Sequence, residues 1–181
     1  MNKLLTLFLF IFLSSDFIKN KDQFIARQGQ VSFFSYASME NIEAQNNQVL
    51  SILDIKKKKV AVSMLMRAFV FKKDLMYEHF NESYIESDIY PKATFEGDII
   101  DFDNTLEKQT KIIRGKLTIH GITKEIDIKT TIENQKGTYV LSGECNVLVK
   151  DFDIKIPPIL ASNIAKMITI KFRFQYATYE E

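Results

Sequence analysis

The 181-residue chain contains one cysteine, two histidines, three prolines and no tryptophan. Because Cys145 is alone, an internal disulfide is excluded even in an oxidising compartment, and the thiol is expected to act as a small core hydrophobe. The histidines, His79 and His120, have no second histidine or cysteine at a metal-binding spacing, so no metal site is predicted. Both are expected to have structural or surface roles.

An excess of charge is also missing, since 24 basic and 23 acidic residues leave a net charge of +1. A general nucleic-acid-binding protein would carry a basic face, so nucleic acid is not predicted as a partner. The one dense basic cluster, Lys56 to Lys59, is expected in a hairpin turn, with a phosphate site as the less favoured reading. The chain has no Ser-His-Asp order, phosphate-binding glycine loop or dinucleotide motif, and no catalytic residue is predicted.

No apolar run is long enough to span a bilayer as a helix. Lys3 precedes a short apolar stretch, Leu4 to Leu13, and this pattern predicts a removable export signal over residues 1–20. Phe12 and Leu13 match a cleavage motif poorly. Residues 21–181 contain no internal repeat or linker, which predicts a single domain. With the export signal removed, this domain is expected to be periplasmic or secreted and to have no transmembrane span. A homodimer is left open.

From Phe24 onward, apolar and polar residues alternate. In "GKLTIHGITKEIDIKTTI", Leu117 and Ile128 fall on one face and Lys116 and Lys129 on the other, which is the period of half-buried strands. Short polar turns favour an antiparallel meander that can close. The predicted strands are Phe24–Gln28, Val31–Ala37, Ile42–Ile52, Val60–Phe71, Thr94–Phe102, Lys111–His120, Lys124–Glu133, Thr138–Val149 and Met167–Tyr176.

Three glycines, Gly97, Gly115 and Gly143, fall on the apolar face of their strands. Glycine inside a strand marks a bend or a close approach, and in a curved barrel it is expected to leave room inside. About eight strands suffice to hold one small ligand. Since the opposite face is charged, an outer-membrane barrel, whose apolar band faces lipid, is excluded.

Two segments interrupt the alternation. Asp74 to Phe80 has helical spacing and predicts a short helix. Pro157 and Pro158 suit a turn and the start of a second helix. These patterns predict an all-β antiparallel meander that can close into a barrel, with one or two short helices.

Three stretches carry a resemblance to one family: "HFNESYIESDIYPKATFEG" (His79 to Gly97), "GKLTIHGITKEIDI" (Gly115 to Ile128) and "VKDFDIKIP" (Val149 to Pro157). With these motifs in this order, the chain resembles the YceI-like proteins, which are exported, polyisoprenoid-binding, lipocalin-like barrels. The resemblance covers nearly everything after the predicted signal. A compact first hairpin around Ser38 to Asn41 departs from the family pattern and is expected near the pocket mouth.

The resemblance implies an all-β, eight-stranded antiparallel lipocalin-like barrel in the periplasm that encloses an isoprenoid or fatty-acyl chain, with no other cofactor and no catalytic set. Inward apolar side chains are then the candidates for lining the cavity. Phe69 joins them only if a bend after Arg67 turns it inward. The predicted lining residues are Phe33, Met64, Met66, Phe69, Phe95, Leu117, Ile119, Ile128, Val147, Phe172 and Phe174.

Some polar residues have simple architectural interpretations. Asp88, Tyr90 and Pro91 are expected in a turn that joins the short helix to the next strand. Two aspartate pairs, Asp101 with Asp103 and Asp151 with Asp153, lack the glycine and glutamate of a calcium loop and are expected at solvated strand ends.

Three functions follow, in order of preference. The first is a non-enzymatic barrel that sequesters or carries a long apolar lipid (a polyisoprenoid, isoprenoid quinone or fatty acyl chain) in the cell envelope. The second is an exported stress-related or protein-interaction barrel whose large inward residues fill the core. The third is a lipid-acting enzyme using His79 or His120, which lacks a recognisable base and orienting partner. A continuous apolar cavity distinguishes the first from the second.

Overall fold

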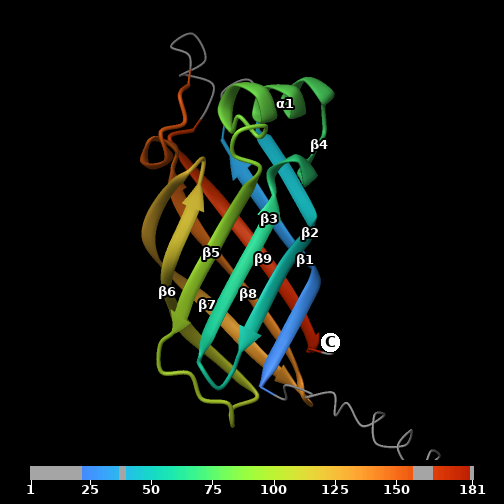
Figure 1. The fold of residues 1–181 in the computed structure, drawn as a ribbon, viewed down its shortest axis with the longest axis vertical. Helices are drawn as coiled ribbons and strands as arrows, with labels where there is room; N and C mark the ends of the chain where they lie inside the picture. Colours follow the sequence, from blue (N-terminus) through green and yellow to red (C-terminus); the bar gives the residue numbers. More distant parts are fainter. Residues whose placement is uncertain (1–21, 37–39, 157–164, 180–181) are drawn as a thin grey trace, which may run out of the picture.

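The computed structural model describes residues 22–36, 40–156 and 165–179, in which the chain forms an antiparallel barrel (Figure 1). The strands follow the order β1-β9-β8-β7-β6-β5-β3-β2, and β2 pairs back with β1 to close the ring. The predicted eight-stranded all-β barrel is therefore confirmed. The strands are β1 (Gln23–Ser35), β2 (Ile42–Asp54), β3 (Lys59–Leu65), β5 (Lys92–Ile99), β6 (Lys108–Ile119), β7 (Ile122–Gln135), β8 (Thr138–Leu148) and β9 (Met167–Thr178).

Two predicted strand boundaries are wrong, each because of a local irregularity. The predicted segments Phe24–Gln28 and Val31–Ala37 are not two strands: both fall on a single strand, β1, which ends at Ser35 and whose register with β2 shifts on both sides of Gly29. The predicted strand Val60–Phe71 is broken by a 3-10 turn, η1 (Met66–Ala68), into β3 and the short β4 (Val70–Phe71), which pairs with β2.

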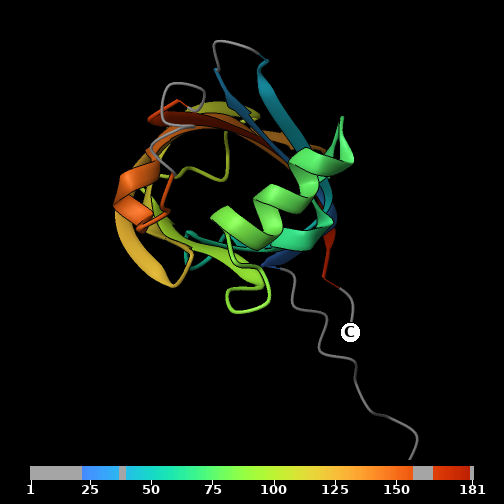
Figure 2. The same ribbon diagram turned by 90° about the horizontal axis from the view of Figure 1, so that it is seen from above.

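Helical structure covers one end of the barrel. The predicted helix is present as α1 (Asp74–His79), and it continues into a π-helical turn, η2 (Phe80–Tyr84). Seen from above, these turns lie across the barrel end (Figure 2). The export signal, nearly all of the second predicted helix, and Ser38 and Met39 of the compact first hairpin lie outside the described residues. Within the described residues, no helix is long and apolar enough to cross a membrane.

The barrel walls are less complete near α1 than at the opposite end. The ladder between β7 and β8 extends from Gln135–Thr138 to Thr130–Gly143, and the remaining parts of both strands are not paired with each other. A 3-10 turn, η3 (Val149–Phe152), contacts β7 on that side. Similarly, β3 pairs only with the Leu50–Asp54 part of β2. The interior near α1 is thus enclosed partly by helical turns.

At the far end of the barrel the interior is solid. Leu53 and Tyr176 are almost completely buried there, and the Tyr176 hydroxyl is 2.7 Å from Oγ of Ser51. Phe24 packs edge-on against Tyr139, with ring centroids 4.8 Å apart. We call this region the packed half and define it by the following residues: Phe24, Leu53, Ile99, Phe102, Ile132, Tyr139 and Tyr176.

Candidate functional site

A cavity of about 390 Å³ occupies the interior between the packed half and α1. Its walls are inward side chains from β1, β3, β5, β6, β7, β8 and β9, and nearly all of its lining atoms are apolar. A cavity of this size is within the range of small-molecule sites, about 300–1,000 Å³. We call this region the hollow half.

All of the predicted lining residues lie on this one cavity. Strand alternation accounts for most of them, because side chains two residues apart point to the same face. Whether they contact a ligand remains a prediction. The residues are Phe33 on β1; Met64 on β3 and Met66 on η1; Phe69 between η1 and β4; Phe95 on β5; Leu117 and Ile119 on β6; Ile128 on β7; Val147 on β8; and Phe172 and Phe174 on β9.

Phe69 reaches the cavity because the chain bends directly before it. The 3-10 turn η1 interrupts the alternation after Leu65, and the backbone N–H of Phe69 donates to the carbonyl of Met66 at 3.3 Å. The ring is then 4% exposed. Phe69 was expected to face inward only if the chain bends after Arg67, and η1 provides that bend.

The three inward glycines have a different effect from the one predicted. A methyl group on the Cα of Gly115 would lie 2.7 Å from Cζ of Phe95, and one on Gly97 would lie 2.9 Å from the same atom. On Gly143 it would lie 2.9 Å from Cζ of Phe172. The predicted empty room is wrong at these positions, because neighbouring phenylalanine rings fill it.

An aromatic cluster closes much of the cavity near α1. The Phe80 ring, from η2, stacks on Phe33 with centroids 5.4 Å apart and lies 5.0 Å from Phe71. Phe69 lies 5.4 Å from Phe33. Sequence reasoning missed Phe80 and Phe71, together with Met76, Tyr84 and Ile85, which also line the cavity. For the residues after Lys73 the helical spacing indicated a helix but not which part of the barrel it would cover, and Phe71 lies before that helix, on β4.

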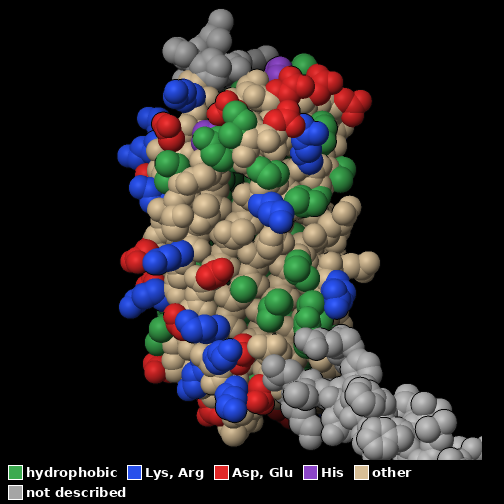
Figure 3. Space-filling view, in the orientation of Figure 1, with side chains coloured by type: hydrophobic (Ala, Val, Ile, Leu, Met, Phe, Trp, Pro, Cys, Tyr) green, Lys and Arg blue, Asp and Glu red, His purple; other side chains and the backbone are tan. Residues whose placement is uncertain are grey.

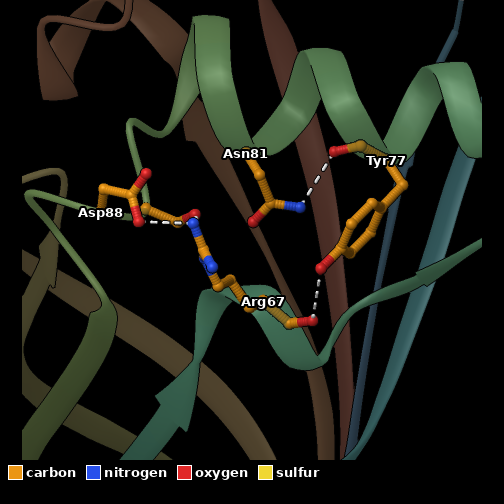
Figure 4. A network of polar contacts seen from close by, with 5 residues as sticks. Arg67, Tyr77, Asn81 and Asp88 are labelled. Atoms are coloured by element: carbon orange, nitrogen blue, oxygen red, sulfur yellow. Dashed lines mark hydrogen bonds and ion pairs between the residues drawn. The ribbon is translucent and has the colours of Figure 1, made fainter.

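Polar contacts hold α1 and η2 above η1 (Figure 4). The Tyr77 hydroxyl donates to the carbonyl of Arg67 at 3.5 Å, and Nδ2 of Asn81 donates to the carbonyl of Tyr77 at 2.9 Å. The Arg67 guanidinium donates to Ser87 at 3.2 Å and pairs with Asp88. Oδ1 of Asn81 is buried without a hydrogen-bond partner. Arg67 thus ties η1 to the turn after η2.

His120 has the structural role that was predicted. It follows β6 with φ of 51°, and its ring lies 2.9 Å from Oε2 of Glu86 and 3.1 Å from the carbonyl of Phe152. Tyr90 packs edge-on against it at 4.4 Å. The predicted turn at Asp88, Tyr90 and Pro91 is therefore joined to the β6–β7 turn. His79 is exposed on α1 at the cavity mouth.

Several ionisable groups in and around the cavity are paired or kept neutral, which limits their reactivity. Glu40 and Lys73, at the mouth, pair with each other. Burial, assisted by Glu144, raises the pKa of the Cys145 thiol to about 11, which makes it a poor nucleophile at neutral pH. No group of three or more metal-ligating side chains occurs among the described residues. Asp103 instead accepts bonds from the N–H and hydroxyl of Thr105, at 2.9 and 2.7 Å.

On the side of the barrel seen in Figure 3, charges of both signs are interspersed with scattered apolar side chains. Arg114 on β6 makes a bidentate pair with Asp127 on β7, both bonds being 2.8 Å. This pair lowers the pKa of Asp127, chiefly through the hydrogen bonds. Lys56 and its neighbours form the predicted exposed hairpin turn between β2 and β3. The outward face is therefore a solvated surface, and the chemistry of the site lies inside.

This architecture is found in a known protein family. The family model of the YceI-like domain matches residues 23–176. Among curated protein sequences no significant match is found.

Several solved structures share the fold. A polyisoprenoid-binding domain from Saccharophagus degradans, implicated in plant cell wall breakdown, has a TM-score of 0.74 and 12% identity over 87% of this chain and 99% of that one. BcnA of Burkholderia cenocepacia gives 0.70 and 20% over 83% and 96%. The Campylobacter jejuni YceI protein gives 0.62 and 18% over 81% and 90%. At these identities the likeness shows the fold alone.

Proposed function

The chain belongs to the YceI-like domain family, and on that premise we propose that it binds a long apolar lipid inside its barrel. The ligand classes are a polyisoprenoid, an isoprenoid quinone or a fatty acyl chain, which the protein sequesters or carries in the cell envelope. The observation that supports this most is the apolar cavity of about 390 Å³ inside the barrel. The printed description of the Saccharophagus degradans relative as polyisoprenoid-binding agrees with it.

Burial of hydrocarbon alone supplies enough affinity for such a role. Each buried CH₂ contributes about 0.8 kcal/mol, so about ten carbons give about 8 kcal/mol before ordering costs. The cavity offers few polar groups that would require a partner: Oγ1 of Thr130 already donates to the carbonyl of Ile128 at 3.3 Å. An extended alkyl or isoprenoid chain can therefore be bound without strong head-group contacts.

The proposed function is binding and not catalysis. A catalyst needs a nucleophile or base held by a second polar group. His120 is held by Glu86 and the carbonyl of Phe152, but it does not line the cavity where a substrate would lie. The Cys145 thiol does line the cavity, but burial keeps it neutral. Transport in the envelope rests on the export signal expected over residues 1–20.

The competing role, a filled barrel that binds other proteins, requires large side chains to interlock along the whole interior. That arrangement describes the packed half only. In the hollow half, Phe33, Ile170 and Phe172 face the interior but remain partly exposed to the cavity. We therefore favour the lipid ligand.

The test is to identify what the purified protein retains. Native mass spectrometry and solvent extraction should find an isoprenoid or fatty acid, and delipidated protein should take up added prenols or fatty acids. Preparations that contain no lipid and take none up would contradict the proposal.

Two adjacent residues on β8 provide a matched pair of variants. Val147 lines the cavity, whereas Leu148 points outward and is 36% exposed. We expect Val147→Phe to occupy ligand space and reduce lipid uptake while the barrel still folds, and Leu148→Phe to bind as the wild type does. Equal uptake by both variants would show that lipid binds elsewhere.

A further inference from the structure

The lining residues of β9 and β8 show the depth at which the cavity ends. On β9 the inward residues from Ile168 to Phe174 line the cavity, and the next inward residue, Tyr176, does not. On β8, Leu141 lines it and Tyr139 does not. Phe174 thus lies at the boundary between the hollow and packed halves, stacked against Phe172 with centroids 5.3 Å apart and planes 24° from parallel.

We propose that Phe174, supported by Phe172, is the floor of the cavity and determines the length of lipid chain that the barrel accepts. The inference rests on the proposed function, because it assigns a specificity-determining role at that same site. Phe174 is 4% exposed, so its ring is surrounded by other groups on almost every side.

The position of the Phe174 ring depends on a glycine in the neighbouring strand. A methyl group on the Cα of Gly29 would lie 2.5 Å from Cδ1 and 2.9 Å from Cε1 of Phe174, and 3.0 Å from the carbonyl oxygen of Val49. The ring therefore occupies space that any other residue at position 29 would take. Gly29 lies where the β1–β2 register shifts, which brings the β1 backbone close to the ring.

Below the ring there is no room for it to move. Tyr176 is 1% exposed, contacts Phe174 edge-on at 6.3 Å and is hydrogen-bonded to Ser51. On the wall side the ring meets β1. The free volume next to Phe174 is the cavity itself, so a side chain at position 29 would displace the ring upward into the space of the ligand.

This geometry predicts opposite effects from two substitutions. Phe174→Ala removes the floor and should shift binding toward longer chains, and Phe174→Leu should give a smaller shift in the same direction. Gly29→Ala raises the floor and should shift binding toward shorter chains. Each additional CH₂ that fits should improve affinity about fourfold.

The experiment measures uptake by delipidated full-length protein of two homologous series, straight-chain primary alcohols and linear prenols of increasing length. Tyr176→Phe is the matched control, because it alters the packed half directly beneath the floor and should keep the wild-type length preference. Thermal unfolding of each variant verifies folding, and the Phe174→Leu variant retains the test if Gly29→Ala does not fold.

The outcomes separate the two proposals. A wild-type protein that binds no member of either series would overturn the proposed function. A wild-type protein that binds, with an unchanged length preference in the Phe174 variants and in folded Gly29→Ala, would overturn the floor alone. Shifts of opposite sign in the Phe174 and Gly29 variants would establish it.

Discussion

The two halves of the barrel are built from the same strands, yet one is solid and the other is hollow. In the packed half, Leu53 is fully buried and Ile132 is 1% exposed. In the hollow half, inward residues such as Ile168 and Ile170 are only partly buried, although they follow the same alternation. Alternation therefore determines which face is inside but not whether the inside is filled.

The difference comes from what the strands enclose. In the packed half, aromatic rings from different strands meet, as Phe24 and Tyr139 do, and the β7–β8 and β2–β3 ladders run to their hairpin turns. Near α1 the β7–β8 and β2–β3 ladders stop, and the wider interior is covered by turns. The hollow half is thus the part of the barrel that its own side chains do not fill.

The largest expected effect tests the face assignment in the wall of the hollow half. Ile128→Asn would place an amide in an apolar wall, costing about 1 to 3 kcal/mol for the unsatisfied group, in addition to about 2 to 5 kcal/mol of lost packing. Its neighbour Lys129 is exposed, and Lys129→Asn should stay within about 0.5 kcal/mol. Urea unfolding measures both. A greater loss from Lys129→Asn would make the face assignment wrong.

A second pair of substitutions compares the halves directly. Leu53→Ala should reduce the free energy of unfolding by about 2 to 5 kcal/mol, because the packed half cannot collapse around the deletion. Ile170→Ala should cost about 1 kcal/mol, since part of that side chain already faces empty space and has fewer contacts to lose. Equal losses in urea unfolding would contradict the distinction between the halves.

A smaller effect is expected from the thiol in the hollow half. Because burial raises the pKa of Cys145 from 9.0 to about 11, the folded state favours the neutral thiol. As pH rises from about 9 to about 11, ionisation in the unfolded chain should therefore remove about 2 to 3 kcal/mol of stability.

The Cys145→Ala variant isolates this contribution, since buried Tyr176 also has a raised pKa. The stability difference between wild type and Cys145→Ala should fall with increasing pH over that interval. A difference that does not change with pH would mean that the thiol is well solvated and that the hollow half is filled with water.

Much of the barrel could be predicted because its strands obey simple alternation. Residue type alone predicts that Leu117 and Ile128 face inward and that Lys116 and Lys129 face water. In the structure the first two are buried and the last two are exposed. The turn at Lys56 to Lys59 and the helix after Lys73 were visible for equally local reasons. That the strands close into a barrel was predicted from the number of strands and from the family motifs.

What could not be predicted depends on contacts between distant segments. Phe80 and Phe33 are far apart in sequence, and no local pattern indicates that their rings stack. Gly29 and Phe174 belong to the first and last strands, so their close approach exists only after closure. Likewise, the glycine at 115 indicated a special position but not that the Phe95 ring would fill it.

Closure of the barrel by its first and last strands also bears on how the chain reaches this structure. β1 pairs with β9 from Phe24–Thr178 to Phe34–Thr169. The first strand to be synthesised therefore cannot complete its pairing until the last strand has left the ribosome. Pairings so distant in sequence form slowly, and synthesis proceeds at about 5 to 20 residues per second. Until β9 emerges, β1 and β8 each have an unpaired edge next to an apolar face, which is the arrangement that invites aggregation. A chain truncated before Met167 should therefore accumulate as aggregate, whatever the stability of the strands that it retains.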